Sequence, residues 1–472
     1  AAVVLSVVCP YACTLGGDVF ALAYMARDGH VHGLNGSGVA PSAATPERFA
    51  DGIPRTGALS ISVPGFVAGI EDLLGRLGTR KLRDLLPPAV RLAREGYPAH
   101  SQHVQNVGTR ADLLAQDAEA TRLFLPGGKS HAEGAPVRQP ELADTLERIA
   151  TGGSRAFYEG DIAAKLVAGI AAAGGIVSAD DLARHRGLWQ EPVAAPFVGH
   201  DIVTMPPNSY GLTLLLQLLD LEAGGIAGID PESAEFVLRG LAARKRAYAA
   251  ADGVIGDPVA LDAPSRKLLA DAVARGLPAA TATPRESRDR CTACVVVLDA
   301  SGNAVSLIQS VSAPFGSGIV APGTGVLLNN RMPGFTTKPG HPNRVGPGKR
   351  PAHTLAPCIV MKSGRPTMAI GTPGTVGQTC TLAQVLVRML ACGQSPERAV
   401  AAPRWSVTLD GKPAVEKGMS ATLRAELAAK VPELSEMSTG WITFGSVKIA
   451  MPTGDGFLGV ADTRRVAAPA AL

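Results

Sequence analysis

Residues 285–306 read RESRDRCTACVVVLDASGNAVS, and this stretch decides how the whole chain is interpreted. Its first six residues are mostly charged and predict an exposed loop, whereas CTACVVVL is among the most strand-like runs in the chain. Cys291, Thr292 and Cys294 lie where the loop meets the strand. Two hypotheses explain this junction. It is a CxxC metal or redox site, or it is a cleavage site whose newly exposed residue carries the chemistry.

Composition and charge narrow the class of protein. The 472 residues are 46% hydrophobic and 18% charged, as in a soluble globular protein. A net charge of +4, with no basic run interleaved with aromatic residues, argues against a nucleic-acid partner. No run approaches the roughly 20 apolar residues of a membrane span, so we expect no membrane partner. Seven cysteines, a low and odd number, indicate a reducing, cytoplasmic compartment.

The opening segment also bears on localisation. Residues 1–15, AAVVLSVVCPYACTL, follow an apolar strand pattern that Pro10 interrupts, and they lack the basic start of a signal peptide. The chain has no initiator methionine, so we expect a natural N-terminal segment to be missing. The expectation of a cytoplasmic protein therefore leaves open a signal peptide lost with that segment.

Hydrophobic periodicity predicts sheets covered by helices rather than two independent domains. A hairpin is expected at residues 17–36 and a surface linker at about 270–291. Helical spacing follows Pro64-Gly65 and recurs at 86–95, 141–150, 161–173 and 233–249. After the linker, strand–turn–strand patterns, a helix and another hairpin are expected at 291–311, 357–371, 377–392 and 442–460.

The metal hypothesis for the CxxC finds little support elsewhere in the sequence. A structural zinc site needs four ligands, usually from a second pair at matching spacing, and Cys9 and Cys13 do not supply one. A thioredoxin-like CxxC would open a helix, whereas this one opens a strand. We therefore predict no metal and no cofactor, and we interpret Cys294 as a buried core residue.

A glycine-rich turn is a second candidate site. Residues 371–378, GTPGTVGQ, join a predicted strand to a predicted helix but lack the ending of a phosphate-binding loop. The turn is either a tight connection or a set of backbone N–H groups that stabilise an oxyanion.

Thr292 suits the cleavage hypothesis. A threonine hydroxyl needs a base, and a cut before Thr292 would create an α-amine with a reference pKa of about 7.7–8.0 on the same residue. That amine can take the hydroxyl proton directly or through water. An ordinary loop-to-strand transition is the alternative.

Ordered motifs along the chain resemble the γ-glutamyltransferase family of N-terminal-nucleophile hydrolases. Before the junction they include SVVCPYACTLGGDVF (6–20) and LSISVPGFVAGIEDLL (59–74). After it they include FGSGIVAPGTGVLLNNRM (315–332), GKRPAHTLAPCIV (348–360) and IGTPGT (370–375). The resemblance implies an α+β fold, a four-layer αββα sandwich, made as a zymogen and cut autocatalytically between Cys291 and Thr292.

The resemblance also implies a catalytic set and a subunit structure. Thr292 lies seven residues before Asp299, the family's spacing for its nucleophile. Ser310 takes the place of a supporting threonine, and Gly374 and Thr375 match the pair whose N–H groups form the oxyanion hole. The large subunit would be 1–291 and the small catalytic subunit 292–472, together one structural domain, and possibly paired as a dimer of such heterodimers.

Substrate recognition is where the chain departs from true γ-glutamyltransferases. Ser37 stands where the family has an arginine for the α-carboxylate, and Gly334 where it has an aspartate for the α-amine. Each lost charge-assisted bond is worth about 1.5–3 kcal/mol, so glutathione is an unfavourable substrate. The other predicted substrate-binding positions are Ser312, Asn330, Arg331, His353 and Thr354. Arg331 is the gained cation, and it either binds a carboxylate or is a solvated or ion-paired arginine.

These features predict an autoprocessed threonine hydrolase that cleaves an amide or C–C bond next to the carbonyl of a small, oxalyl-like acid. The motifs resemble oxamate-type amidohydrolases and the C–C hydrolase homologues of 4-alkylproline antibiotic pathways. The rival hypotheses are a γ-glutamyl transferase or hydrolase and an unprocessed, non-catalytic homologue.

Overall fold

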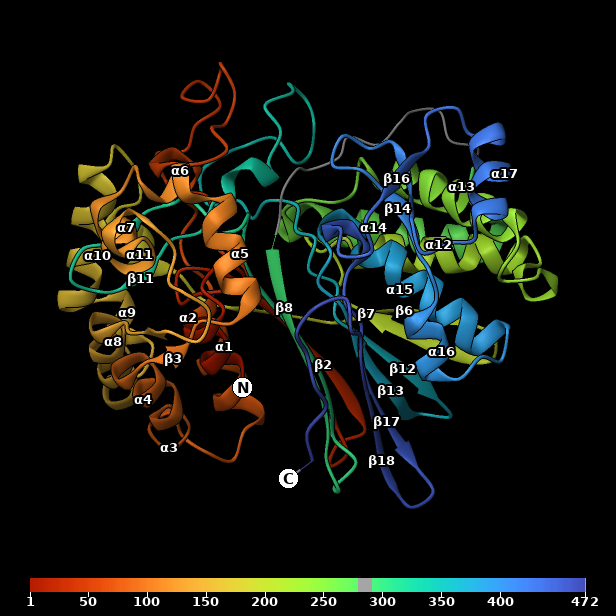
Figure 1. Ribbon diagram of the computed structural model, residues 1–472, viewed down its shortest axis with the longest axis horizontal. Helices are drawn as coiled ribbons and strands as arrows, with labels where there is room; N and C mark the ends of the chain where they lie inside the picture. Colours follow the sequence, from red (N-terminus) through yellow and green to blue (C-terminus); the bar gives the residue numbers. More distant parts are fainter. Residues whose placement is uncertain (279–290, 472) are drawn as a thin grey trace.

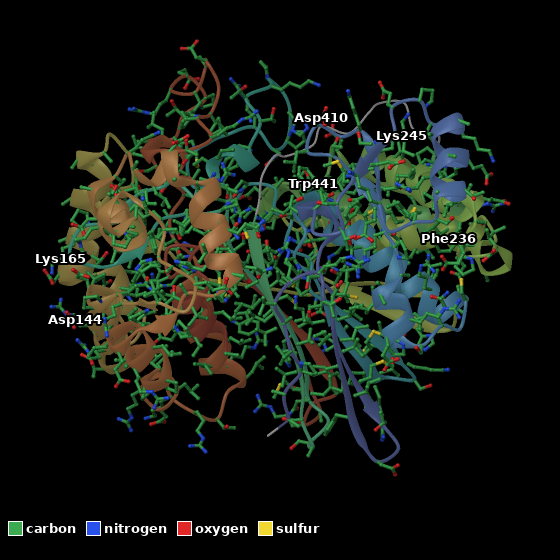
Figure 2. All side chains as sticks on the ribbon, in the orientation of Figure 1. Asp144, Lys165, Phe236, Lys245, Asp410 and Trp441 are labelled. Atoms are coloured by element: carbon green, nitrogen blue, oxygen red, sulfur yellow. The ribbon has the colours of Figure 1, made fainter. Side chains whose placement is uncertain are left out.

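The computed structural model describes residues 1–278 and 291–471. These residues form four layers: a layer of helices, two sheets packed against each other, and a second layer of helices (Figure 1). This architecture confirms the αββα sandwich. Side chains fill the space between the layers, while charged residues such as Asp144 and Lys165 lie at the outer edge (Figure 2).

The first sheet has the strand order β5-β2-β1-β9-β8, and all its neighbouring strands are antiparallel. Its strands are β1 (Asp18–Met25), β2 (His30–Gly36), β5 (Leu188–Gln190), β8 (Cys291–Leu298) and β9 (Ala304–Ser312). The helices on its outer side are α1 (Ala2–Val8), α2 (Phe66–Leu77), α3 (Leu82–Leu85), α4 (Pro87–Glu95), α5 (Ser101–Thr109), α6 (Ala111–Leu114), α7 (Ala118–Phe124), α8 (Pro140–Gly152), α9 (Arg155–Tyr158), α10 (Gly160–Ala172) and α11 (Ala179–Arg184).

The second sheet has the order β18-β17-β13-β12-β7-β6. Its strands are β6 (Val193–Phe197), β7 (His200–Thr204), β12 (Cys358–Lys362), β13 (Arg365–Gly371), β17 (Lys448–Thr453) and β18 (Gly456–Ala461). The helices on its outer side are α12 (Gly211–Ala223), α13 (Ala234–Ala251), α14 (Pro258–Arg275), α15 (Gln378–Leu386), α16 (Pro396–Ala401) and α17 (Ala421–Lys430).

Three small sheets complete the described part of the chain. Their strands are β3 (Tyr97–Pro98) with β4 (Pro136–Val137), β10 (Val320–Ala321) with β11 (Val326–Leu327), and β14 (Trp405–Val407), β15 (Pro413–Glu416) and β16 (Ser435–Met437).

Side chains alternate between two apolar cores along the central strands. On β1, Val19 and Ala21 pack with the outer helices, whereas Phe20 and Leu22 pack between the sheets. This period of two is what a strand buried on both faces requires. It also means that polar residues in phase with Phe20 face the opposite sheet.

Residues on both sides of the predicted cut are interleaved in both sheets. β1 pairs with β9 in the first sheet, and β7 pairs with β12 in the second. Segments before and after residue 291 therefore contribute strands to both sheets, and neither sheet is complete without both segments.

Three sequence-based boundaries were wrong. Residues 2–8 form the helix α1 rather than a strand, and the N–H of Cys9 donates to the Leu5 carbonyl at its end. The predicted linker begins too early, because α14 continues to Arg275 and ends at Gly276, whose φ of 75° suits only glycine. The last hairpin begins at Lys448, not at 442. The rest of the linker, 279–290, lies outside the described residues.

Candidate active site

Thr292 occupies an irregularity near the start of β8, which is the edge strand of the first sheet and lies near the middle of the molecule in Figure 1. Cys291 pairs with Ser312 and Ala293 with Gln309, so Thr292 has no register partner on β9. Thr292 is only 4% exposed, and its hydroxyl has no hydrogen-bond partner among residues 1–278 and 291–471. The predicted nucleophile is therefore held on a rigid strand with its hydroxyl uncommitted.

The pleat shows which way Thr292 faces. Cys291 and Ala293 pack in a core on the helix side, whereas Cys294 packs between the two sheets. Thr292 is in phase with Cys294 and so faces the second sheet. Asp18 and Ser310 are in phase with Phe20 and Ile308 of the same inter-sheet core, and they are register partners. Thr292, Ser310 and Asp18 thus lie in a row across three adjacent strands, and neighbouring strands of a sheet are about 4.8 Å apart.

Ser310 contacts the predicted scissile bond. Its hydroxyl donates to the carbonyl oxygen of Cys291 at 2.5 Å and accepts from the N–H of Ser312 at 2.9 Å. A donor on that oxygen polarises the carbonyl between Cys291 and Thr292. The residue predicted to support the nucleophile therefore lies where it can stabilise an oxyanion formed at the Cys291 carbonyl.

The glycine-rich turn connects β13 to α15 on the opposing sheet. Gly374 has φ 143° and Thr375 has φ 55°, a conformation that strains a β-branched residue. Within the described part of the chain, neither backbone N–H donates to a protein acceptor. A methyl group on Gly371 would lie 2.5 Å from Cys294 Sγ, so the end of β13 lies against the start of β8. The turn is therefore on the side of the molecule that Thr292 faces.

Arg331 is fully buried and ion-paired. Its Nε donates to Asp18 Oδ2 at 2.9 Å, while Nη1 and Nη2 have no hydrogen-bond partner in the described part of the chain. Burial lowers the pKa of Arg331, and the charge of Asp18 opposes that shift. A buried guanidinium with two unpartnered amino groups is costly unless an anion binds them. The ion-pair interpretation thus describes one edge of the guanidinium and leaves the other available for a carboxylate.

Asp18 orders this cluster, and the sequence analysis did not select it. Its Oδ2 also accepts from His353 Nε2 at 3.1 Å, and its Oδ1 accepts from the Gly38 N–H at 2.7 Å. Burial alone would raise the pKa of Asp18, but the hydrogen bond from His353 and the charge of Arg331 outweigh it and lower the pKa to about 2. The signal available in the sequence was a single carboxylate at the start of an apolar strand.

The remaining predicted positions differ in how free their side chains are. The Asn330 amide is engaged by backbone at both ends, at Ala313 N and Arg55 O. Ser37 is fully buried, and its hydroxyl donates to Asn35 Oδ1 at 2.6 Å. The buried Thr354 hydroxyl has no partner, and Ser312 is held at φ 82° beside Cys291. The structure brings these residues near Asp18 or Ser310, and of the hydroxyl groups among them that of Thr354 is buried with no partner among the described residues.

A cation missed by the sequence analysis lies beside Ser37. Arg350 is 9% exposed, its Nη1 is 3.5 Å from Ser37 Oγ, and its Nη2 donates to the Arg186 carbonyl at 2.9 Å. No described carboxylate lies within 4.0 Å of this guanidinium. Arg350, from another loop, therefore places a positive charge beside Ser37.

The geometry does not support a CxxC site. Cys291 and Cys294 face opposite sides of β8, so their thiols cannot share one ion or form a local disulfide. Burial raises the pKa of Cys294 to about 12, which disfavours a thiolate.

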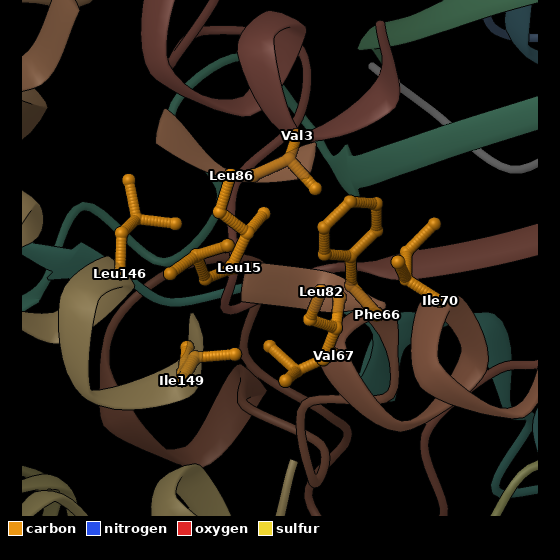
Figure 3. Close-up of a pocket in the computed structure, with 9 residues that line it drawn as sticks. All are labelled: Val3, Leu15, Phe66, Val67, Ile70, Leu82, Leu86, Leu146 and Ile149. Atoms are coloured by element: carbon orange, nitrogen blue, oxygen red, sulfur yellow. The ribbon is translucent and has the colours of Figure 1, made fainter. Parts of the chain in front are cut away.

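A separate pocket lies among the outer helices of the first layer (Figure 3). All its lining side chains are hydrocarbon: Val3, Leu15, Phe66, Val67, Ile70, Leu82, Leu86, Leu146 and Ile149. It offers no polar group for catalysis or for orienting a substrate. Across the described residues, the helices are too short or too polar to cross a bilayer.

Comparison with known proteins identifies relatives along the whole chain. The sequence model described as "Gamma-glutamyltranspeptidase" matches residues 1–472. The chain is 37% identical to the glutathione hydrolase-like YwrD proenzyme of Bacillus subtilis, over 85% of this chain and 78% of that protein. It is 32% identical to the oxamate amidohydrolase proenzyme of Klebsiella pneumoniae, over 86% and 79%. The cephalosporin acylase of Bacillus halodurans matches with a TM-score of 0.87, at 29% identity, over 98% of this chain and 88% of that one. These matches confirm the resemblance found in the motifs.

Proposed function

The chain belongs to the γ-glutamyltranspeptidase family of hydrolases, and we propose that it is a self-cleaving threonine hydrolase for small acyl donors that carry a carboxylate. The observation that carries this proposal is the buried Arg331, whose Nη1 and Nη2 have no partner among the residues that the structure describes. Arg331 forms an ion pair with Asp18, and Asp18 pairs with Ser310 in the sheet that also contains Thr292.

The contact between Ser310 and Cys291 supports self-cleavage as the first step. The Thr292 hydroxyl attacks the Cys291 carbonyl carbon, and the Ser310 hydroxyl stabilises the oxyanion that forms. The C–N bond breaks, the nitrogen takes the hydroxyl proton, and the acyl group remains on Thr292 Oγ1 as an ester. Water then hydrolyses the ester and releases the Cys291 carboxylate. The products are the predicted heterodimer of 1–291 and 292–472, with a free threonine amine.

The same threonine would then act on the substrate. Its amine accepts the hydroxyl proton as Oγ1 attacks the substrate carbonyl, and the N–H groups of Gly374 and Thr375 receive the oxyanion. The proton passes to the leaving group as an acyl-enzyme forms, and water releases the acid. Departure on nitrogen fits the oxamate amidohydrolase relative. C–C cleavage, a role in antibiotic biosynthesis and a cytoplasmic location stay predictions.

Substrate choice is proposed to depend on charge. The carboxylate of an oxalyl-like donor would meet Nη1 and Nη2 of Arg331, and the buried environment strengthens such a bond. A γ-glutamyl donor also presents an α-ammonium group, and Gly334 offers it no carboxylate. The glutathione hydrolase names of some relatives keep γ-glutamyl transfer as the alternative to test.

The deciding experiment compares two chromogenic anilides that release the same 4-nitroaniline. We expect the 4-nitroanilide of oxalic acid to turn over faster than γ-glutamyl-4-nitroanilide, and Thr292→Ala to abolish the activity. Faster turnover of the γ-glutamyl anilide would overturn the substrate assignment. Full activity of Thr292→Ala would overturn the mechanism.

A further inference from the structure

Lys448 brings a cation into the layer between the sheets. It begins β17 and pairs with Gly371, the last residue of β13. Its neighbours Val447 and Ile449 pack in the core on the helix side. The Lys448 side chain is out of phase with them and therefore faces the first sheet.

The ammonium group is held toward the glycine-rich turn. Nζ donates to the Ser446 carbonyl at 2.8 Å and to Ser446 Oγ at 2.7 Å. The N–H of Ser446 in turn donates to Thr372 Oγ1 at 3.0 Å, within the segment that leads to Gly374. Gly371 lies against Cys294 on β8. The contacts with Ser446 therefore direct Nζ beyond Gly371, toward the end of β8 that holds Thr292.

No described carboxylate lies within 4.0 Å of Nζ. Asp462 is engaged by Arg404 at 2.6 Å and by Arg464 at 3.3 Å. Burial lowers the pKa of Lys448 to about 8. The charged or titratable side chains that interact electrostatically with Lys448 are Cys294 on β8, Cys9 after α1, Arg404 before β14, and Asp462 and Arg465 after β18. Apart from the ion-paired Asp462 and two thiols, this environment is positive.

We propose that Lys448 is a positioning residue whose ammonium keeps the freed α-amine of Thr292 in its neutral, proton-accepting form at neutral pH. Two nearby amines disfavour double protonation, and the two acceptors on Ser446 keep the shared proton on Lys448. The inference rests on the proposed function, because the amine exists only after cleavage before Thr292.

The test measures the amine directly and needs no substrate. The processed enzyme is labelled with trace acetic anhydride between pH 5.5 and 10, and mass spectrometry quantifies acetylation of the Thr292 α-amine. Lys448→Met removes the charge and Lys448→Arg keeps it. Lys362→Met, at the exposed end of β12 in the same sheet, is the matched control.

We expect the labelling midpoint to rise by about one to two pH units in Lys448→Met, the size of shift that one nearby like charge produces, and to change little in the other two variants. An unmoved midpoint in Lys448→Met, or equal shifts in Lys448→Met and Lys448→Arg, would overturn the inference. Where Lys448→Met does not fold, Ser446→Ala must raise the midpoint by loosening the ammonium, and no rise overturns the inference. A chain still joined at Thr292 would instead count against the proposed function.

Discussion

Replacing Ser310 with alanine removes a hydroxyl that touches the bond to be cut. The 2.5 Å contact with the Cys291 carbonyl is the only hydrogen bond that this oxygen is seen to receive from a side chain in the described residues. Loss of one oxyanion donor slows acyl chemistry by about 10²–10³, which corresponds to about 2.7–4 kcal/mol. We therefore expect Ser310→Ala to process itself by that factor more slowly, while Ser310→Thr keeps most of the rate.

The assay follows conversion of the intact 48 kDa chain into two fragments on denaturing gels during incubation of freshly purified protein. Ser306→Ala is the matched control, because this hydroxyl on the same strand also donates to a backbone carbonyl, that of Ile370 at 2.9 Å. Equal processing rates for Ser310→Ala and wild type would refute the role of this contact. Equal slowing in both variants would point to a general effect of losing a buried hydroxyl.

Three further predictions concern the anion cluster and the turn. Arg331→Lys keeps a charge beside Asp18 but removes the forked N–H groups of the guanidinium. The KM for an oxalyl anilide should therefore rise about 10–100-fold, with kcat less affected. An unchanged KM would mean that the substrate carboxylate binds elsewhere. Because the pKa of Asp18 falls from 3.8 in the unfolded chain to about 2 in the folded protein, its ionised form stabilises the fold at pH values above 3.8. About 2 kcal/mol of the free energy of unfolding should be lost as the pH falls from 3.8 toward 2. Urea unfolding of Asp18→Asn should lack this component, and a wild-type slope would contradict it. Gly374→Ala would place a methyl group 3.1 Å from Gly445 Cα at φ 143°, so acyl transfer should fall at least about tenfold, measured as kcat; undiminished kcat would remove Gly374 from the oxyanion hole.

Much of the fold around the candidate site could be predicted because the relevant signals are local. The charged run before CTACVVVL marked the start of β8, and the strand–turn–helix pattern marked the turn at Gly374. Ordered motifs then identified the family. These features depend on short-range patterns, which sequence reasoning handles well.

The missed features depend on contacts between distant segments. Asp18 and Arg331 are 313 positions apart, and no local pattern shows that they form a buried pair. From the sequence alone, Lys448 is an ordinary exposed lysine at the start of a strand. Only the packing of the two sheets places it against β8. The helix α1 was read as a strand because a short apolar run fits both periods until its packing partner is known.

The central claim is that Thr292 becomes a chain terminus before it acts, and intact-mass measurement of the purified, active protein tests this most directly. The account predicts two polypeptides, the smaller beginning with Thr292. A single unbroken chain that hydrolyses substrate at full rate would contradict it.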